Sequence, residues 1–400
     1  MEYVPRQEIK KRIDNFQSHL RERDLACAFI FQNVDVFYFA GTIQTSALFV
    51  PVEGDPVLMV QKSLDRARQE SPLERIVPLK NLYHIPRTLH DLGIYPSGIA
   101  GLELDVLPAY LYIWFQDVFK QCQTEDVSDS IRRLRMIKSA YETEQIKKAS
   151  IILHTGLTEI SGILREGMTE LEVDGYMGYI ARREGHMGIM RMRGWNQEMT
   201  YVHVLSGKSG SVPSFLNSPQ GGEGTTPAMA QGAGFKRIAR NEPVEIDYGA
   251  AVNGYISDQS RTYVIGQLPE IMEKAHECSK KILMLMEKEG RPGTLCSDLY
   301  YMAVEEARSN GFGDVFMGYG DSQAKFVGHG VGLEIDDLPL LSHNFKSRLQ
   351  QGMVIAIEPK FVFPELGVVG LEDVYEVTSS GLNRLTLTDQ KIIYITPEAN

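Results

Sequence analysis

Two aspartates flank the strongest turn signal in the chain and are candidates for binding a cation. The stretch VEIDYGAAVNGYISDQSRTYVIG covers residues 244–266, and its Asn253-Gly254 pair is typical of a two-residue β-hairpin turn. With this turn, Asp247 and Asp258 lie on the same face of the hairpin as diagonal neighbours. Two neighbouring carboxylates repel each other unless a cation lies between them. We therefore predict a divalent metal here, with two surface aspartates as the alternative.

Three further residues of metal-ligating type follow in glycine-rich or apolar surroundings. His329 stands between two glycines in residues 326–339, so the backbone can approach whatever the imidazole binds, although such a histidine can also be structural. Glu358 ends one apolar run and Glu372 lies within the next. A buried carboxylate needs a partner, but the pattern leaves open whether Glu372 or Asp373 faces inward.

The elements that must position these residues divide into two expected domains. An amphipathic helix is expected over residues 7–22, and the apolar runs 47–52 and 56–60 flank a turn and predict a β-hairpin. Strands and helices mix in this way up to about residue 127. We expect an α/β domain over residues 1–132 and a catalytic α+β domain over residues 133–400.

The second expected domain begins with helices and continues with strands. Capping boxes at Ser139-Glu142 and Thr169-Glu172 predict two helix starts. Strand signals dominate from Val244 onward, and they are interrupted by helices expected at roughly 269–289 and 295–310.

Two segments of this domain have an unusual composition. Residues 206–234 form a long Gly- and Pro-rich loop without the glycine spacing of nucleotide-binding loops, so we expect either a connector or a pocket wall. Residues 186–198 contain Arg191 and Arg193, which could bind a carboxylate of the substrate. The alternative is that this segment is the charged face of a helix.

Composition and charge argue against several classes of protein. The chain has 400 residues, of which 41 are basic and 52 acidic, and its net charge of −11 disfavours binding to nucleic acids or anionic membranes. Its four cysteines form no CxxC pair, so we do not expect a thiolate zinc site. We expect these cysteines to be reduced thiols. Without an apolar leader or an apolar run of 18 residues, we expect a cytoplasmic protein with no membrane span.

The motifs around the candidate ligands resemble the pita-bread metallopeptidase family, which contains Xaa-Pro aminopeptidases, prolidases, methionine aminopeptidases and creatinases. The family's order of ligands is Asp, Asp, His, Glu, Glu. It is matched by IDYG, GYISDQSRT, GHGVGLE, IEP and GLEDV, which contain Asp247, Asp258, His329, Glu358 and Glu372. Residues 37–60 and 134–150 also resemble proline-specific members, which favours the two-domain Xaa-Pro/creatinase branch.

The resemblance implies a fold and a chemistry. Helices would cover a strongly curved antiparallel sheet, two divalent ions would lie on its inner face, and the chain would form a homodimer. Asp258, His329 and Glu358 would surround one ion, Asp247 would chelate the other, Glu372 would bridge them, and Glu358 would shuttle protons. Oxygen-rich ligation suits Mn²⁺, with Co²⁺, Fe²⁺ or Zn²⁺ as alternatives.

The residues expected around the substrate depart from the family pattern. Asp336 stands where the family has a second histidine, seven residues after His329. No histidine lies between His203 and Asp247, where proline-specific members carry a substrate histidine. The candidate substrate-binding residues are therefore Asp336, His203, Arg191 and Arg193.

Three functional hypotheses follow. The leading one is a metal-dependent hydrolase that cleaves N-terminal Xaa-Pro bonds, as an aminopeptidase or dipeptidase, with a metal-activated hydroxide. The second is a creatinase-like member that acts on a small non-peptide amide or amidine. The third, a non-catalytic binding protein on the same fold, is disfavoured by the complete ligand set.

Overall fold

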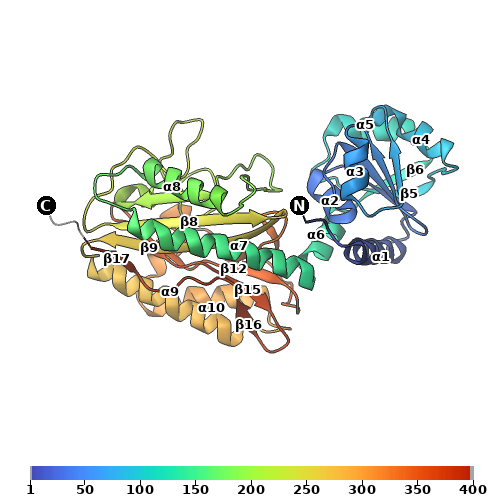
Figure 1. Ribbon diagram of the computed structural model, residues 1–400. Coiled ribbons are helices and arrows are strands. Elements are labelled where there is room, and N and C mark those ends of the chain that lie inside the picture. Colours follow the sequence, from blue (N-terminus) through green and yellow to red (C-terminus); the bar gives the residue numbers. More distant parts are fainter. Residues whose placement is uncertain (1, 397–400) are drawn as a thin grey trace. The chain divides into compact units, whose positions relative to one another are not determined.

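Short apolar runs near the N-terminus assemble into a six-stranded mixed sheet of order β4-β3-β2-β1-β5-β6. This sheet belongs to the first of two compact units, Met1–Arg135 and Met136–Asn400, in a computed structural model that describes residues 2–396 (Figure 1). The expected hairpin is present, because β2 and β3 pair antiparallel with Phe49 opposite Val57. The α/β character expected for the N-terminal part is thereby confirmed.

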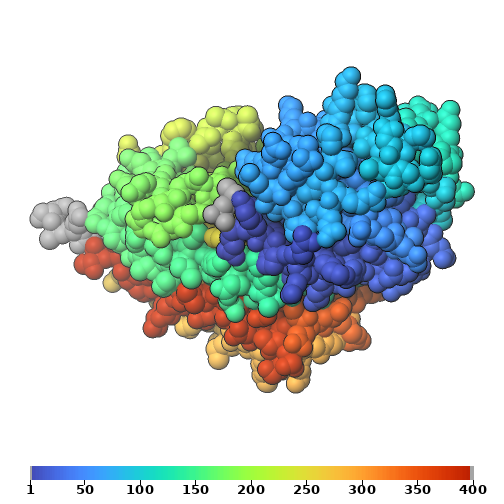
Figure 2. All heavy atoms as spheres, turned by 45° about the vertical axis from the view of Figure 1, so that its right-hand side comes forward, coloured from blue at the N-terminus to red at the C-terminus, as the bar shows by residue number. Residues whose placement is uncertain are grey.

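The first unit contains the following elements: α1 (Arg6–Glu22), β1 (Cys27–Ile30), α2 (Asn33–Ala40), β2 (Ser46–Pro51), β3 (Val57–Val60), α3 (Leu64–Glu70), β4 (Arg75–Pro78), η1 (Leu82–His84), α4 (Ile85–Asp91), β5 (Gly98–Leu102), α5 (Ala109–Val118), β6 (Cys122–Asp126) and α6 (Ser128–Met136), which reaches the boundary. The predicted amphipathic helix is α1, whose apolar side chains Ile9, Ile13 and Phe16 are buried. Its charged residues Lys10, Lys11 and Asp14 are exposed. The first residues of the chain, α1 included, are dark blue in Figure 2.

The second unit contains the helices α7 (Ala140–Glu159), η2 (Ile160–Gly162), α8 (Glu170–Arg183), η3 (Gly207–Ser211), α9 (Glu270–Glu289), α10 (Cys296–Ser309), η4 (Gly313–Val315) and η5 (Gly320–Ser322). Its strands are β7 (Val202–Ser206), β8 (Pro243–Val252), β9 (Tyr255–Ile265), β10 (Phe326–Gly330), β11 (Asp337–Ser342), β12 (Val354–Ile357), β13 (Lys360–Phe363), β14 (Gly367–Gly370), β15 (Asp373–Val377), β16 (Leu382–Arg384) and β17 (Ile393–Ile395). Both predicted capping boxes are formed, at the starts of α7 and α8.

The strands of the second unit form three sheets, of orders β17-β9-β8-β7, β11-β10-β12-β15-β16 and β13-β14. Pairing is antiparallel except between β17 and β9. A bridge between Ser260 and Glu372 joins the first sheet to the segment that enters β15. The single sheet that we expected is thus divided, but it has the same antiparallel character.

Helices cover the outer faces of these sheets, as Figure 1 shows for α7 over β8 and β9 and for α9 beside α10. On β8 the residues Val244, Ile246 and Tyr248 pack with apolar residues of α7 and α8. Residues of a strand alternate between faces, so Glu245 and Asp247 lie on the opposite, inner face. The alternation thereby places the carboxylates on the side that the helices do not cover.

Residues 186–198 form no helix, so the interpretation of this segment as a charged helix face is wrong. The chain leaves α8 at Gly185, a glycine with φ +100°, and runs irregularly up to β7. Among the described residues, no helix is both long and apolar enough to cross a membrane.

Candidate metal centre

The β8–β9 hairpin brings the first two candidate ligands together in the predicted register. Gly249 pairs with Asp258 and Asp247 pairs with Ser260, so the two aspartates are diagonal neighbours on one face. Asn253 adopts φ 49° and Gly254 adopts φ 92°, the left-handed backbone that such a turn requires. The sequence was therefore sufficient to place these two side chains.

The other three candidate ligands reach the same place from the second sheet. His329 lies on β10 opposite Ala356 of β12, and Glu358 follows directly after β12. Glu372 precedes β15 and is bridged to Ser260 of β9. Single ligand atoms of Asp258, His329 and Glu372 all lie within 4.8 Å of one another, which is close enough to share one metal ion.

The atoms of this cluster have the chemistry that a divalent metal requires. Nδ1 of His329 lies 3.1 Å from the carbonyl oxygen of Gly330. If Nδ1 carries the proton and donates to this carbonyl, the lone pair of Nε2 faces the cluster. Oε1 of Glu372 is buried and accepts no hydrogen bond from the described residues, although it lies 3.7 Å from Nε2 of His329. A buried carboxylate oxygen that accepts no hydrogen bond is suited to bind a cation.

One residue of the cluster was not predicted from the sequence. Nζ of Lys360 donates hydrogen bonds of 3.0 Å to Asp247 Oδ2, Glu358 Oε2 and Glu372 Oε2, and its side chain is fully buried. The signal was present, because a lysine in the apolar strand KFVF must bury its charge and needs carboxylate partners.

Burial and the lysine charge determine the protonation of these groups. Burial opposes the ionisation of Asp247, but the Lys360 ammonium outweighs it, so the pKa of this carboxyl lies below its usual value. Burial, with the charge of Asp247, raises the pKa of Asp258 to about 7. Burial also raises the pKa of Glu245, beneath the cluster, to about 8, although Thr262 Oγ1 donates to this carboxylate at 2.6 Å. The cluster thus favours a bound cation, and Glu245 favours its neutral form.

The structure also decides between Glu372 and Asp373. Glu372 faces the cluster, whereas Asp373 accepts a 2.7 Å hydrogen bond from Nη2 of Arg261, with both side chains fully buried. Nη1 of the same arginine donates to the backbone carbonyl of Glu372 at 2.9 Å. Arg261 therefore positions the segment that carries Glu372 without being part of the cluster itself.

The predicted substrate residues Asp336, Arg191 and Arg193 lie together, in contacts between two chain segments. The carboxylate of Asp336 accepts hydrogen bonds from the backbone N–H groups of Arg193 and Gly194, at 2.9 and 3.0 Å. The side chain of Arg193 lies 3.8 Å from that of Glu334 in a buried ion pair. Asp336 thus holds the irregular segment after α8 in position, and the substrate roles of these three residues remain predictions.

His203, the fourth predicted substrate residue, lies next to the cluster. It pairs with Asp247 across β7 and β8 and is buried, and burial lowers the pKa of its imidazole. Gln220, which the sequence did not single out, donates from Nε2 to Asp247 Oδ2 at 2.6 Å. The Gly- and Pro-rich loop that contains Gln220 thereby contributes directly to the cluster.

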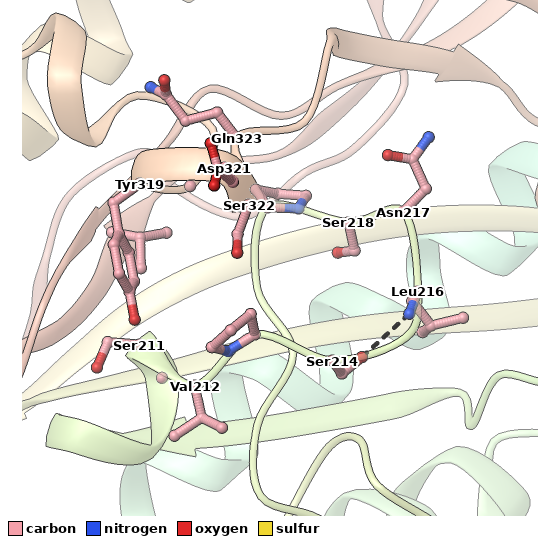
Figure 3. A pocket seen from close by; sticks show the side chains of 15 residues that line it. Ser211, Val212, Ser214, Leu216, Asn217, Ser218, Tyr319, Asp321, Ser322 and Gln323 are labelled. Carbon is pink, nitrogen blue, oxygen red and sulfur yellow. Dashed lines mark hydrogen bonds between the residues drawn. The ribbon is translucent and has the colours of Figure 1, made fainter.

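A polar pocket of about 290 Å³ lies beside this loop (Figure 3). One wall comes from the loop after η3, with Ser214 and Asn217, and the other from η5, with Tyr319 and Ser322. Val362 also lines the pocket, and it lies two positions after Lys360, on the same face of β13. The pocket-wall interpretation therefore holds for the part of the loop between Gly210 and Pro219.

Comparisons with known proteins agree with this arrangement along almost the whole chain. A curated Xaa-Pro dipeptidase from Pyrococcus furiosus is 28% identical over 389 residues, which is 96% of this chain and 100% of that protein. A solved prolidase from Pyrococcus furiosus is 28% identical with a TM-score of 0.76, covering 93% of this chain and 99% of that one. A solved Xaa-Pro dipeptidase from Bacillus anthracis is 21% identical and shares the fold with a TM-score of 0.83, covering 96% of this chain and 99% of that one.

A mixed N-terminal domain followed by helix-covered sheets that hold a carboxylate and histidine cluster is the arrangement of a two-domain metallopeptidase. Residues 12–137 match the creatinase/prolidase N-terminal domain, and residues 144–379 match metallopeptidase family M24. The chain belongs to metallopeptidase family M24. Membership implies a peptidase that binds a divalent metal, and the cluster of Asp258, His329 and Glu372 supplies suitable ligands.

Proposed function

We propose that this chain is a metal-dependent Xaa-Pro peptidase, which cleaves the bond before proline at the N-terminus of short peptides. One observation carries the proposal: five ligand-type residues from distant parts of the sequence converge on one buried face. The Xaa-Pro dipeptidases related to this chain along almost its whole length support the peptidase over the creatinase-like alternative.

We assign Asp247, Asp258, His329, Glu358 and Glu372 to the metal site. The oxygen-rich set suits Mn²⁺ best, with Co²⁺, Fe²⁺ or Zn²⁺ as alternatives. A bound metal would supply a water of lowered pKa and would polarise the carbonyl of the scissile bond.

Glu358 is the proposed proton carrier of the reaction. Its carboxylate is held between Lys360, at 3.0 Å from Oε2, and His329, at 3.7 Å from Oε1. A fixed carboxylate at this place can accept a proton from the attacking water and return it to the leaving proline nitrogen. His329 directs the lone pair of Nε2 at the cluster if Nδ1 donates to the carbonyl of Gly330.

The polar pocket, whose lining includes Pro219 next to Gln220, the residue that donates to Asp247, is the proposed substrate site. Its lining combines hydroxyl and amide side chains with one carboxylate, Asp321. Such groups can hydrogen-bond the peptide backbone, and Asp321 can pair with a free α-amino group. His203, beside Asp247, is the proposed replacement for the substrate histidine that the sequence lacks, and Arg191, Arg193 and Asp336 are further candidates.

The experiment is hydrolysis of a panel of Xaa-Pro dipeptides and short Xaa-Pro peptides by the Mn²⁺-loaded protein. We expect cleavage before proline, and we expect Asp258→Asn to abolish it while circular dichroism stays unchanged. Matched peptides with alanine in place of proline test the specificity. Absence of cleavage by a folded protein that binds metal would contradict the proposal.

Two further proposals concern the state of the protein in the cell. We propose that it works in the cytoplasm, which its four free and buried cysteines support. We also propose a homodimer, on the basis of the family resemblance. Size-exclusion chromatography with light scattering would test the dimer.

A further inference from the structure

The chain places a cation of its own, the Lys360 ammonium, among three carboxylates of the cluster. Nζ of Lys360 lies 3.0 Å from one oxygen each of Asp247, Glu358 and Glu372. The other oxygens of the two glutamates, both Oε1, lie 3.7 Å from Nε2 of His329. Each glutamate thus directs one oxygen to the lysine and the other to the group that contains His329 and Asp258.

An ammonium and a divalent ion compete for the same oxygens. A metal bonded at about 2.2 Å to one of the oxygens that accept from Lys360 (Asp247 Oδ2, Glu358 Oε2 or Glu372 Oε2) would lie within about 5 Å of Nζ, where like charges repel strongly in an interior of low dielectric. The lysine is attached to the chain and does not have to be recruited from solution. At limiting metal concentration, the lysine therefore competes better than a dissolved metal ion for these oxygens.

Displacement of the lysine would also be unfavourable. Its side chain has 0% exposure, and within the described residues its hydrogen bonds go only to these three carboxylates. An ammonium that lost them would remain in the interior without a partner, and a buried unpaired charge is strongly unfavourable. With the lysine in place, Asp247 pairs with an ammonium instead of chelating an ion.

We infer that Lys360 replaces one of the two metal ions, so that each chain binds one divalent ion, between Asp258, His329, Glu358 and Glu372. The inference rests on the metal site of the proposed function. It revises both the expectation of two ions and the assignment of Asp247 as a metal ligand, because neither took account of the lysine.

The test is metal stoichiometry, measured without reference to activity. The full chain is stripped with a chelator and dialysed against Mn²⁺, and bound metal per chain is determined by mass spectrometry. We expect one ion for the unmodified protein and two for Lys360→Ala, because the smaller side chain opens the second position. Lys138→Ala is the matched control, since Lys138 is also buried and faces a carboxylate, Asp337, at 3.6 Å, and it should keep one ion.

A second measurement needs no variant, in case Lys360→Ala does not fold. The electron paramagnetic resonance spectrum of the Mn²⁺-loaded unmodified protein should be that of an isolated ion. A spin-coupled pair, two ions in the unmodified protein, no bound ion, or one ion in folded Lys360→Ala would each overturn the inference. One bound ion without Xaa-Pro cleavage would contradict the proposed function and support this inference.

Discussion

The buried pair of Arg261 and Asp373 offers the sharpest test of how the fold holds the cluster. Arg261 donates to Asp373 and to four backbone carbonyls, those of Ser260, Glu372, Thr388 and Asp389, at 2.6 to 2.9 Å. Asp373→Asn keeps the shape of the side chain but removes its charge, so the guanidinium stays buried without a counter-ion. Breaking one partner of a buried pair costs about 3–5 kcal/mol.

We expect the same order of loss here, because neither side chain can reach solvent. The other partners of Asp373 include Gln259, Thr386 and Gln390, which hydrogen-bond it at 2.7 to 2.8 Å and are neutral, so they cannot replace the charge. Arg384 lies 3.8 Å from Asp373 and would itself lose a carboxylate. The double variant Arg261→Met/Asp373→Asn should lose less than the sum of the single losses, because the two residues act as one unit.

The assay is urea unfolding of the full chain, followed by far-ultraviolet circular dichroism. Hydrogen exchange of β9 and β15 assigns the transition to the second unit, since two units need not unfold together. Asp389→Asn is the matched control, because the carboxylate of Asp389 is exposed beside Lys391 and its loss should leave stability unchanged. A loss below about 1 kcal/mol for Asp373→Asn would refute the reasoning.

Three further predictions test the site and its surroundings. Metal removal should lower the melting temperature, because an ion at 100 times its Kd adds about 2.7 kcal/mol to the free energy of unfolding. Calorimetry should show no such metal effect in Asp258→Asn. His276 is fully buried, and burial lowers the pKa of its imidazole from 6.5 to about 3. As the pH falls below 6.5, the unfolded chain therefore binds a proton at His276 before the folded chain does, and the free energy of unfolding decreases. Urea titrations at a series of pH values, with pH 8 as the reference, should show this decrease in the unmodified protein relative to His276→Leu. The expected slope is up to about 1.4 kcal/mol per pH unit. Ser139→Ala removes the side-chain cap of α7 and should cost about 1 kcal/mol in urea unfolding, whereas a cost near zero would contradict the role of the capping box.

Local sequence signals were sufficient for many elements of the fold. The spacing of Ile9, Ile13 and Phe16 predicted α1, and Ser139 with Glu142 predicted the start of α7. These signals work because a helix or a turn depends on residues that are near one another in the chain. The interpretation of residues 186–198 as a helix face failed because the segment is held by Asp336, which is distant in sequence.

The same distinction applies to the candidate site. Asn253-Gly254 fixed the register of the hairpin, and with it the shared face of Asp247 and Asp258, because the turn type alone sets the pairing of the two strands. The family resemblance indicated His329, Glu358 and Glu372, but residue types and spacing by themselves could not bring them to this hairpin.

Only the tertiary structure decided what surrounds these ligands. Arg261 draws Asp373 to one side and leaves Glu372 on the other, a choice that depends on a residue more than a hundred positions away. In the sequence, Lys360 is a charged residue in an apolar strand with no evident partner. In the folded chain, its Nζ lies 3.0 Å from three carboxylates. The sequence by itself determined which groups were available, and the packing of distant strands determined which charges meet, because electrostatic interactions depend on distance in space and on burial.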